Sequence, residues 1–295
     1  MEIKVQKSNK VTKAVIACGG YSTRFMPISK AVPKEMLPIY DKPVIHYIME
    51  ELQCAGITDV LLLVGRGREM LLNYFDRNLE IEDVMAKKVG REKAEEVLNP
   101  FANMNIQYRR VAIPRGTADN IWHAKSFVGD EPFMMMYSDD VFFADNQGGF
   151  GGNVTSEMIA MYGCGDMSPA QNLVACVPVA PEHAHKYGII KPGVHASDGC
   201  YIGNILDVHE IVEKPKTNTC HTPMAVVGRF ILSPKIIELI DERKIKNEER
   251  EICLMDVINE VAKSGEVSAW RTAAKRFDTG TPEGLIKAGN YVADK

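Results

Sequence analysis

The stretch "IACGGYSTRFMPISKAVPKEML", residues 16–37, decides the fold. Two adjacent glycines, Gly19 and Gly20, follow a short apolar run, and two cations, Arg24 and Lys34, come soon after them. Ligands of doubly wound α/β sheets bind at the carboxyl ends of strands, where a glycine turn lets backbone N–H groups approach phosphate oxygens. Arg can hold two phosphate oxygens at once, and Lys adds a point charge. The stretch therefore predicts a polyphosphate site after a first β-strand.

The glycine turn does not match the two common phosphate-binding motifs. The dinucleotide pattern G-x-G-x-x-G is absent from it, and no Gly-Lys-Ser/Thr follows as in a Walker loop. Taken alone, the turn is equally consistent with an ordinary strand-to-helix connection. The rest of the chain has to decide between these two interpretations.

Apolar and amphipathic runs alternate after this turn. "KAVIAC" (13–18) and "DVLLLVG" (59–65) have the short, buried character of strands, and "KPVIHYIMEELQCAG" (42–56) has apolar residues at helical spacing. A strand, a helix and a second strand predict a right-handed parallel crossover. Further elements are expected as a helical insertion at 67–99, strands at 105–113 and 131–140, and a helix at 117–128.

The second half of the chain is richer in strands, and the stretch 145–155 is expected to be a loop. Because the later strands can extend the same sheet, we predict a single α/β domain over 1–295. Its fold is expected to be three-layer and Rossmann-like, with a mixed, mainly parallel sheet flanked by helices. The expected elements are strands at 172–180, 205–215, 225–232 and 267–273, helices at 233–243 and 252–265, a loop at 276–282 and a last helix.

Composition narrows the classes of partner and the compartment. The 295 residues are 45% hydrophobic and carry a net charge of −4 with both signs interspersed, which argues against a nucleic-acid partner. No apolar run reaches the roughly 20 residues that span a bilayer, so no membrane partner is expected. The seven scattered cysteines form no CxxC pair and indicate reduced thiols, hence a cytoplasmic protein.

The glycine stretch resembles the opening of the nucleotidyltransferases that make nucleoside-diphosphate sugars. Their pattern is Gly-Gly-x-Gly-Thr-Arg, then Pro, then Lys-Pro/Glu-x-Leu, and "GGYSTRFMP" and "PKEML" are similar to it. "PKEMLPIYDKPVIHYIMEEL" (33–52) resembles the bacterial uridylyltransferase branch of this family. The resemblance continues over about 270 residues, through "YSDD" (137–140), "YGII" (187–190), "VEKP" (212–215), "VGRFIL" (227–232), "EICLMDVI" (251–258) and "RFDTGTPEG" (276–284).

The resemblance implies a reaction between two anions. A sugar-1-phosphate oxygen attacks the α-phosphorus of a nucleoside triphosphate in line, and pyrophosphate leaves. UTP and glucose 1-phosphate are the substrates that the branch implies. Because the nucleophile is already anionic, the enzyme needs cations and a metal rather than a general base.

The resemblance also implies a role for particular residues. Asp139 and Asp278, which each follow an apolar strand, are the expected ligands of Mg²⁺, which one or two carboxylates suffice to hold. Arg24, Lys34 and Lys214 are the expected catalytic cations. Strands in 172–232 are expected to bind the sugar. The expected substrate-binding residues are Gly19, Gly20, Ser22, Thr23, Glu35, Arg110, Gly116, Thr117, Tyr187, Gly188, Glu213 and Gly228.

Glu213 and Lys214 are adjacent, and this constrains their expected roles. Lys214 is expected on the sugar phosphate and Glu213 on sugar hydroxyls. Neighbouring strand residues point to opposite faces, so both can serve one pocket only where a strand ends, as Pro215 suggests. Gly188 and Gly228 are expected to leave room for the hexose or the ribose.

Two positions depart from the family pattern. Ser22 replaces a glycine, which is costly if that residue needs a positive φ. In the base-contacting loop, Val111 stands where uridylyltransferases carry Gln, and "GTAD" (116–119) is more similar to the adenylyl and guanylyl branches. The alternatives are therefore an adenylyl-, guanylyl- or thymidylyltransferase, or a non-catalytic nucleotide-sugar-binding paralogue.

The insertion at 67–99 is charged, with apolar Leu71, Leu72, Tyr74 and Phe75 interleaved. It is predicted to form a helical arm outside the main sheet that takes part in subunit contact. We therefore expect a homo-oligomer, either a dimer or a tetramer.

Overall fold

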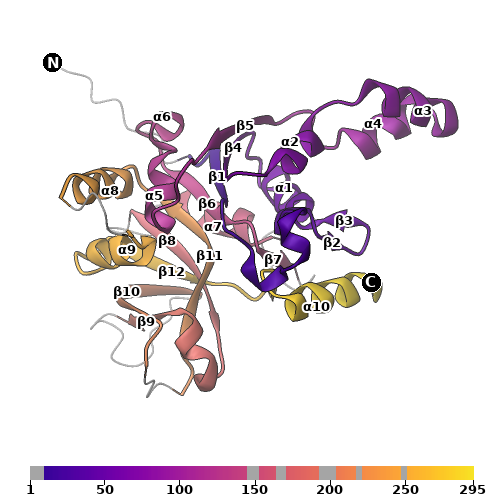
Figure 1. Cartoon of the computed structure of the whole chain (residues 1–295). Helices are drawn as coiled ribbons and strands as arrows, with labels where there is room; N and C mark the ends of the chain where they lie inside the picture. Colours follow the sequence, from indigo (N-terminus) through magenta and orange to yellow (C-terminus); the bar gives the residue numbers. More distant parts are fainter. Residues whose placement is uncertain (1–9, 145–152, 164–170, 193–203, 217–220, 247–250) are drawn as a thin grey trace.

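The computed structural model describes residues 10–144, 153–163, 171–192, 204–216, 221–246 and 251–295. Its main feature is a nine-stranded sheet with the order β5-β4-β1-β6-β11-β8-β12-β10-β9 (Figure 1). These strands are β1 (Lys13–Cys18), β4 (Asp59–Val64), β5 (Asn105–Arg110), β6 (Phe133–Tyr137), β8 (Asn172–Pro178), β9 (Gly188–Pro192), β10 (Ile205–Glu213), β11 (Met224–Leu232) and β12 (Val267–Arg271).

Two small sheets accompany the large one. One pairs β2 (Pro38–Ile39) with β3 (Lys42–Pro43), and the other pairs β7 (Asp140–Phe143) with β13 (Lys275–Asp278) in antiparallel register. The second of these sheets joins segments more than 130 residues apart. It therefore decides where Asp139 and Asp278 lie.

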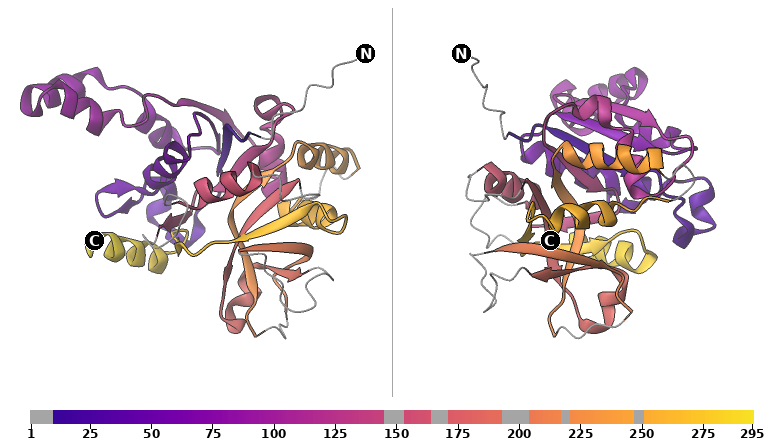
Figure 2. Two further views of the ribbon diagram at one scale, coloured as in Figure 1. Left: turned by 180° about the vertical axis from the view of Figure 1, so that it is seen from behind. Right: turned by 90° about the vertical axis from the view of Figure 1, so that its left-hand side faces the viewer.

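Helices cover both faces of the large sheet (Figure 2). One face packs under α5, α8 and α9, and the other packs under α1 and α7, so that each face has its own apolar core. α10 packs on β2 and β13 of the small sheets. The helices are α1 (Val44–Cys54), α2 (Glu69–Phe75), α3 (Leu79–Val89), α4 (Arg91–Leu98), α5 (Thr117–Trp122), α6 (Lys125–Val128), α7 (Val154–Gly163), α8 (Lys235–Lys246), α9 (Leu254–Ala262) and α10 (Pro282–Ala293). The predicted three-layer α/β class is confirmed.

The alternation of the sequence explains the central layer. In β1 the residues Ala14, Val15 and Ile16 are all fully buried, as expected for a strand that is covered on both faces. Helix α1 buries Ile45 and Leu52 on one face against this sheet.

The parallel character of the sheet is limited to part of it. β5, β4, β1 and β6 are parallel to one another, and β12 is parallel to β8. β11, by contrast, runs antiparallel to both β6 and β8, and β10 runs antiparallel to β12 and β9. The sheet is therefore mixed, and the expected predominance of parallel pairs holds only for its first half.

Several local predictions need correction. The helix expected at 117–128 is interrupted at His123 and Ala124, so that α5 and α6 are separate. The loop expected at 276–282 begins inside β13. The loop expected at 145–155 ends earlier, because α7 begins at Val154, and its residues 145–152 lie outside the described residues.

The insertion forms α2, α3 and α4. α3 and α4 project away from the rest of the molecule in both Figure 1 and Figure 2. The four apolar residues expected to make a subunit contact do not lie on this projection. Leu71 is fully buried, and Leu72, Tyr74 and Phe75 pack against the core, because α2 lies on the body of the protein. The exposed apolar side chains of α3 and α4 are Leu79, Ile81, Val84, Val89 and Val97.

Candidate active site

Arg68, which was not predicted from the sequence, hydrogen-bonds to the backbone of the glycine turn. The Nε atom of Arg68 donates to the Cys18 carbonyl at 3.1 Å, and its Nη2 donates to the Gly20 carbonyl. Arg68 is buried and follows β4, the parallel neighbour of β1. Because two carbonyls of the turn are bound on the protein side, the turn is fixed in one conformation.

Beyond the turn, the serine in place of the family glycine does adopt a left-handed backbone. Ser22 has φ 53 and ψ 38, and its hydroxyl donates to the Gly20 carbonyl at 3.4 Å. The 3-10 turn Thr23–Phe25 follows, buries Phe25 and leaves Thr23 and Arg24 exposed. The backbone of Ser22 is therefore left-handed, the conformation that glycine adopts most readily, at some cost in strain.

Lys34 lies directly beside the turn and meets one of the predicted metal ligands. A Cβ atom on Gly20 would lie 3.8 Å from Lys34 Nζ, and Nζ lies 2.5 Å from Asp139 Oδ2. Burial by itself lowers the pKa of Lys34, but the carboxylates of Asp139 and Glu35 outweigh it and raise this pKa above its ordinary value. Lys34 is therefore a fixed cation between the glycine turn and the carboxylates.

Glu35, expected to bind substrate, is instead fully buried. Its Oε1 accepts from the Ser138 hydroxyl at 3.0 Å, and its Oε2 lies 3.8 Å from Arg68 Nε. Burial raises the pKa of Glu35, although Lys34 and Arg68 oppose this effect. The prediction was wrong for this residue, because its side chain turns into the core and supports the two cations.

The two predicted metal ligands lie side by side. Asp278 is the last residue of β13, and the Thr279 amide and hydroxyl both donate to the Asp139 carbonyl at 2.8 Å. A Cβ atom on Gly280 would lie 2.6 Å from Asp139 Oδ2 and 3.0 Å from Asp278 Oδ1, so both oxygens border the same small space. The β7–β13 sheet thus brings together two carboxylates 139 positions apart in the chain.

The electrostatics of this pair favour a cation. Burial and the carboxylates of Asp140 and Asp139 raise the pKa of Asp278, although Arg276 opposes them. In the described part of the chain, no group of three or more His, Cys, Asp or Glu side chains is arranged to hold a metal. Two carboxylates with phosphates and waters suffice for Mg²⁺, so the donors present fit this ion.

Asp140 is a structural partner of these carboxylates and does not face solvent. Its Oδ1 accepts two hydrogen bonds from Arg276 at 2.6 and 2.9 Å, and its Oδ2 accepts from the Gly228 amide at 2.8 Å. A Cβ atom on Gly228 would lie 2.8 Å from Asp140 Oδ2 and 2.9 Å from Tyr137 Cβ. Gly228 therefore makes room for Asp140, which explains the glycine without a sugar, and the expectation that it also leaves space for a sugar stays a prediction.

The expected sugar-binding residues come together at the end of β10. Glu213 ends the strand, and Lys214 adopts φ 45, which breaks the alternation of side chains. Lys214 Nζ lies 3.3 Å from Glu213 Oε1, and the Lys214 amide donates to the Tyr187 carbonyl at 3.0 Å. A Cβ atom on Gly188 would lie 3.1 Å from Glu213 Oε2. The strained backbone at Lys214 thus lets both side chains serve one site.

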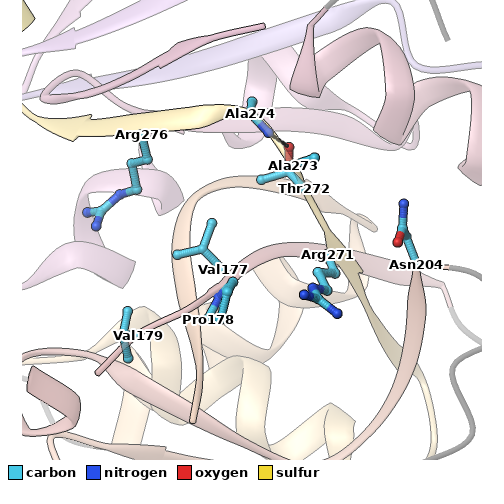
Figure 3. Close-up of a pocket in the computed structure, with 9 residues that line it drawn as sticks. All are labelled: Val177, Pro178, Val179, Asn204, Arg271, Thr272, Ala273, Ala274 and Arg276. Atoms are coloured by element: carbon cyan, nitrogen blue, oxygen red, sulfur yellow. Dashed lines mark hydrogen bonds between the residues drawn. The ribbon is translucent and has the colours of Figure 1, made fainter. Parts of the chain in front are cut away.

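Arg276 links the sugar side to the carboxylates. Its Nη1 donates to the Tyr187 hydroxyl at 3.3 Å while its other nitrogens bind Asp140. Arg276 also lines a cavity of about 660 Å³, and Figure 3 shows the residues around it. This lining includes no residue that was expected to bind substrate. The lining residues are Val177, Pro178, Val179, Asn204, Arg271, Thr272, Ala273, Ala274 and Arg276.

The base-contacting loop is tied to the segment before α9. A Cβ atom on Gly116, which has φ 101, would lie 2.4 Å from the Ile252 carbonyl. The Thr117 hydroxyl accepts from the Leu254 amide at 2.9 Å, and the Ala118 amide donates to Ile252 at 3.0 Å. Gly116 and Thr117 thus have structural roles that explain their identity without a base. Arg110 is exposed at the end of β5.

Sequence reasoning missed Arg68 and Arg276, which hold the glycine turn and the carboxylates. The signal for Arg68 was its position just after β4, the strand beside β1, in "GRGR" (65–68). The signal for Arg276 was its place in the "RFDTG" motif, two residues before Asp278.

Comparisons with known proteins identify the family of the chain. The profile of a family described as "Nucleotidyl transferase" matches residues 13–295. The chain is 34% identical over 280 residues to UTP–glucose-1-phosphate uridylyltransferase of Streptococcus pneumoniae, covering 95% of this chain and 89% of that protein. It is 33% identical to the enzyme of the same name from Bacillus subtilis, covering 94% and 89%.

Solved structures are similar over almost the whole chain. The crystal structure of an apo UDP-glucose pyrophosphorylase has a TM-score of 0.83 at 30% identity and covers 96% of this chain and 98% of that one. A UTP-bound UDP-glucose pyrophosphorylase from Acinetobacter baumannii has a TM-score of 0.81 at 29% identity, covering 96% and 93%. A complex with UDP-glucose has a TM-score of 0.79 at 29% identity, covering 97% and 100%.

Proposed function

Because the chain belongs to the nucleotidyl transferase family, we propose that it transfers a uridylyl group from UTP to glucose 1-phosphate, giving UDP-glucose and pyrophosphate. The observation that carries this proposal is the meeting of Lys34, beside the glycine turn, with the carboxylate pair Asp139 and Asp278. The names of the relatives and the ligands of the solved structures support the choice of substrates.

The reaction breaks one phosphoanhydride bond and forms another. An oxygen of the sugar phosphate attacks the α-phosphorus of UTP, the bond to the β-phosphate breaks, and its electron pair leaves on pyrophosphate. No proton has to be removed from the nucleophile. The protein must therefore bring two anions together and stabilise the charge of the transition state.

Separate cations are available for the two anions. Lys34 and Arg24 flank the glycine turn and would bind the triphosphate, while Lys214 at the end of β10 would bind the sugar phosphate. Glu213, next to Lys214, would accept hydrogen bonds from sugar hydroxyls. Asp139 and Asp278 would hold Mg²⁺, which neutralises charge on the phosphates when it is bound.

The GTAD-type loop does not favour another nucleotide. Thr117 is held by Leu254, and Asp119 is held by Lys244. Contacts within the protein therefore explain why Thr117 and Asp119 occur in this loop. The similarity of "GTAD" to the adenylyl and guanylyl branches thus does not indicate that adenine or guanine is bound.

The function is tested by pyrophosphate release with four nucleoside triphosphates, each combined with several hexose 1-phosphates. UTP with glucose 1-phosphate should give the highest kcat/KM. Equal or higher values with another triphosphate would contradict the uridylyl assignment, and no release with any pair would contradict the enzyme class.

The location and the assembly of the enzyme are part of the same proposal. We expect it to act in the cytoplasm, because its scattered cysteines suit a reducing compartment. No helix among the described residues is long and apolar enough to cross a membrane. We also expect a homo-oligomer, supported by the exposed apolar side chains on the projecting helices α3 and α4.

A further inference from the structure

Helix α5 carries one polar side chain whose buried oxygen lacks a partner. Within this fully described helix, Thr117 accepts from Leu254, Asp119 binds Lys244, and the Trp122 indole donates to Asp241 at 2.8 Å. The Oδ1 atom of Asn120, by contrast, is buried and accepts no hydrogen bond. Buried polar atoms without partners are rare and costly, so this oxygen calls for an explanation.

Asn120 lies beside the glycine turn. A Cβ atom on Gly19 would lie 3.6 Å from Asn120 Nδ2, and a Cβ atom on Gly20 would lie 3.8 Å from Lys34 Nζ. The two glycines therefore have different neighbours, a carboxamide at Gly19 and a cation at Gly20. A ligand that lies along the turn meets one group at each end.

The turn also carries no side chain at Gly19, the position next to Asn120. A Cβ atom on Gly65, at the end of β4, would lie 3.2 Å from the Gly19 carbonyl. The absence of side chains at Gly19 and Gly65 lets these two backbones approach closely and leaves no Cβ atom above them. A planar aromatic ring could lie against such a backbone surface.

We propose that the Asn120 carboxamide recognises the uracil of UTP. This inference rests on the proposed function, which places the phosphates at Lys34 and Asp139 and so leaves the Gly19 side for the base. A carboxamide presents a donor and an acceptor side by side. Uracil presents the complementary pair, the N3–H donor and an adjacent carbonyl oxygen, so that two parallel hydrogen bonds satisfy Oδ1 and Nδ2 together.

A recognition role predicts behaviour that a structural role does not. If Asn120 held the fold together, its truncation would lower the melting temperature. Because its Oδ1 has no partner in the protein, Asn120→Ala should leave the melting temperature unchanged or raise it. The same change should lower kcat/KM for UTP about 5- to 100-fold, the range expected for a lost bidentate contact to a base. The KM for glucose 1-phosphate should stay unchanged.

The decisive variant is Asn120→Asp, compared with the wild type for UTP and CTP. A carboxylate only accepts hydrogen bonds, so it loses its contact to a uracil carbonyl but can accept from the exocyclic amine of cytosine. The ratio of kcat/KM for UTP to that for CTP should fall at least about tenfold, the lower part of the range for such contacts. The matched control is Asn73→Asp, an exposed asparagine on α2, which should leave this ratio unchanged.

Two outcomes would overturn the assignment. One is a UTP-to-CTP ratio of kcat/KM in Asn120→Asp that equals that of the wild type. The other is a clearly lower melting temperature of Asn120→Ala together with a wild-type ratio in that same variant. If the wild type releases no pyrophosphate with any of the triphosphates, the proposed function fails. Calorimetric binding of UTP and CTP to the same variants then decides the role of Asn120. Equal loss of affinity for both nucleotides in Asn120→Asp would then reject it.

Discussion

The ammonium nitrogen of Lys34 lies 2.5 Å from the Oδ2 atom of Asp139. Lys34 lies beside the glycine turn and Asp139 belongs to the carboxylate pair, so the proposed triphosphate site and the proposed metal site share a boundary. Entry of a metal and a triphosphate must change the surroundings of both groups. On the proposed function, the pair would therefore link binding of the nucleotide to binding of the metal.

Replacement of Lys34 by Ala should damage handling of the nucleotide most. Removing a cation that pairs with a buried phosphate costs about 2–5 kcal/mol, or roughly 30- to several-thousand-fold in kcat/KM. Steady-state kinetics with UTP varied at saturating glucose 1-phosphate measures this loss. A mutant whose KM for UTP and kcat both match those of the wild type would contradict the role of Lys34.

Lys214→Ala should instead raise the KM for glucose 1-phosphate, because Lys214 lies beside Glu213 and Tyr187 at the end of β10. Its side chain is 65% exposed before substrate binds, so its removal should not unfold the protein. Lys216→Ala, an exposed lysine two residues further on, serves as the control. Equal effects on both substrates in Lys34→Ala and Lys214→Ala would mean that the two anions are not divided between these residues.

Asp139→Asn and Asp278→Asn should each lower turnover by orders of magnitude while the fold stays intact. Each change removes one of two carboxylates that converge on the same space, so Mg²⁺ affinity falls with it. Asp130→Asn, at an exposed position after α6, is the matched control. Turnover of the wild type that persists in excess chelator would exclude the metal role.

The sequence allowed prediction of those site residues that follow strands. Asp139 follows the apolar strand β6, and a strand that ends predicts a side chain at the edge of a sheet. Asp278, expected in the loop 276–282, lies instead at the end of β13, whose sequence Lys-Arg-Phe-Asp is not apolar. The end of β10 was predictable in the same way, because Pro215 marks it. These inferences need only the local sequence and the rule that ligands bind at strand ends.

The supporting contacts could not be predicted in this way. Arg68 binds backbone carbonyls, which carry no sequence signal, and the buried partners of Asp140 come from β11 and β13. Gly116 and Gly228 were assigned to ligands although neighbouring protein atoms explain them, because a sequence shows that a site needs glycine but not what approaches it. The same limit explains why Asn120 had no sequence signal.

Ser22→Gly should stabilise the protein by about 1 kcal/mol. The left-handed region costs about 1–2 kcal/mol for a residue with a Cβ atom, and part of this gain is offset by the greater freedom of glycine in the unfolded chain. Ser126→Gly, at an exposed position inside α6 without a positive φ, should be destabilising instead. Urea denaturation with unchanged m-values measures both effects. A lower midpoint for Ser22→Gly would show that the serine hydroxyl contributes more than the backbone strain costs.

The projecting helices lead to a prediction about assembly. Leu79 and Val84 on α3 are 71% and 51% exposed, and Val97 on α4 is 51% exposed. Exposed apolar side chains on projecting helices favour a contact surface, and the expected occupant is a second copy of the chain. The double change Leu79→Asp with Val84→Asp should therefore lower the mass in solution from that of a homo-oligomer to that of the 32.8 kDa monomer. Light scattering after size exclusion measures this mass.

Lys87→Asp, which replaces an exposed charged residue of the same helix, is the control and should keep the oligomer. An unchanged mass in the double variant would place the subunit contact elsewhere on the molecule.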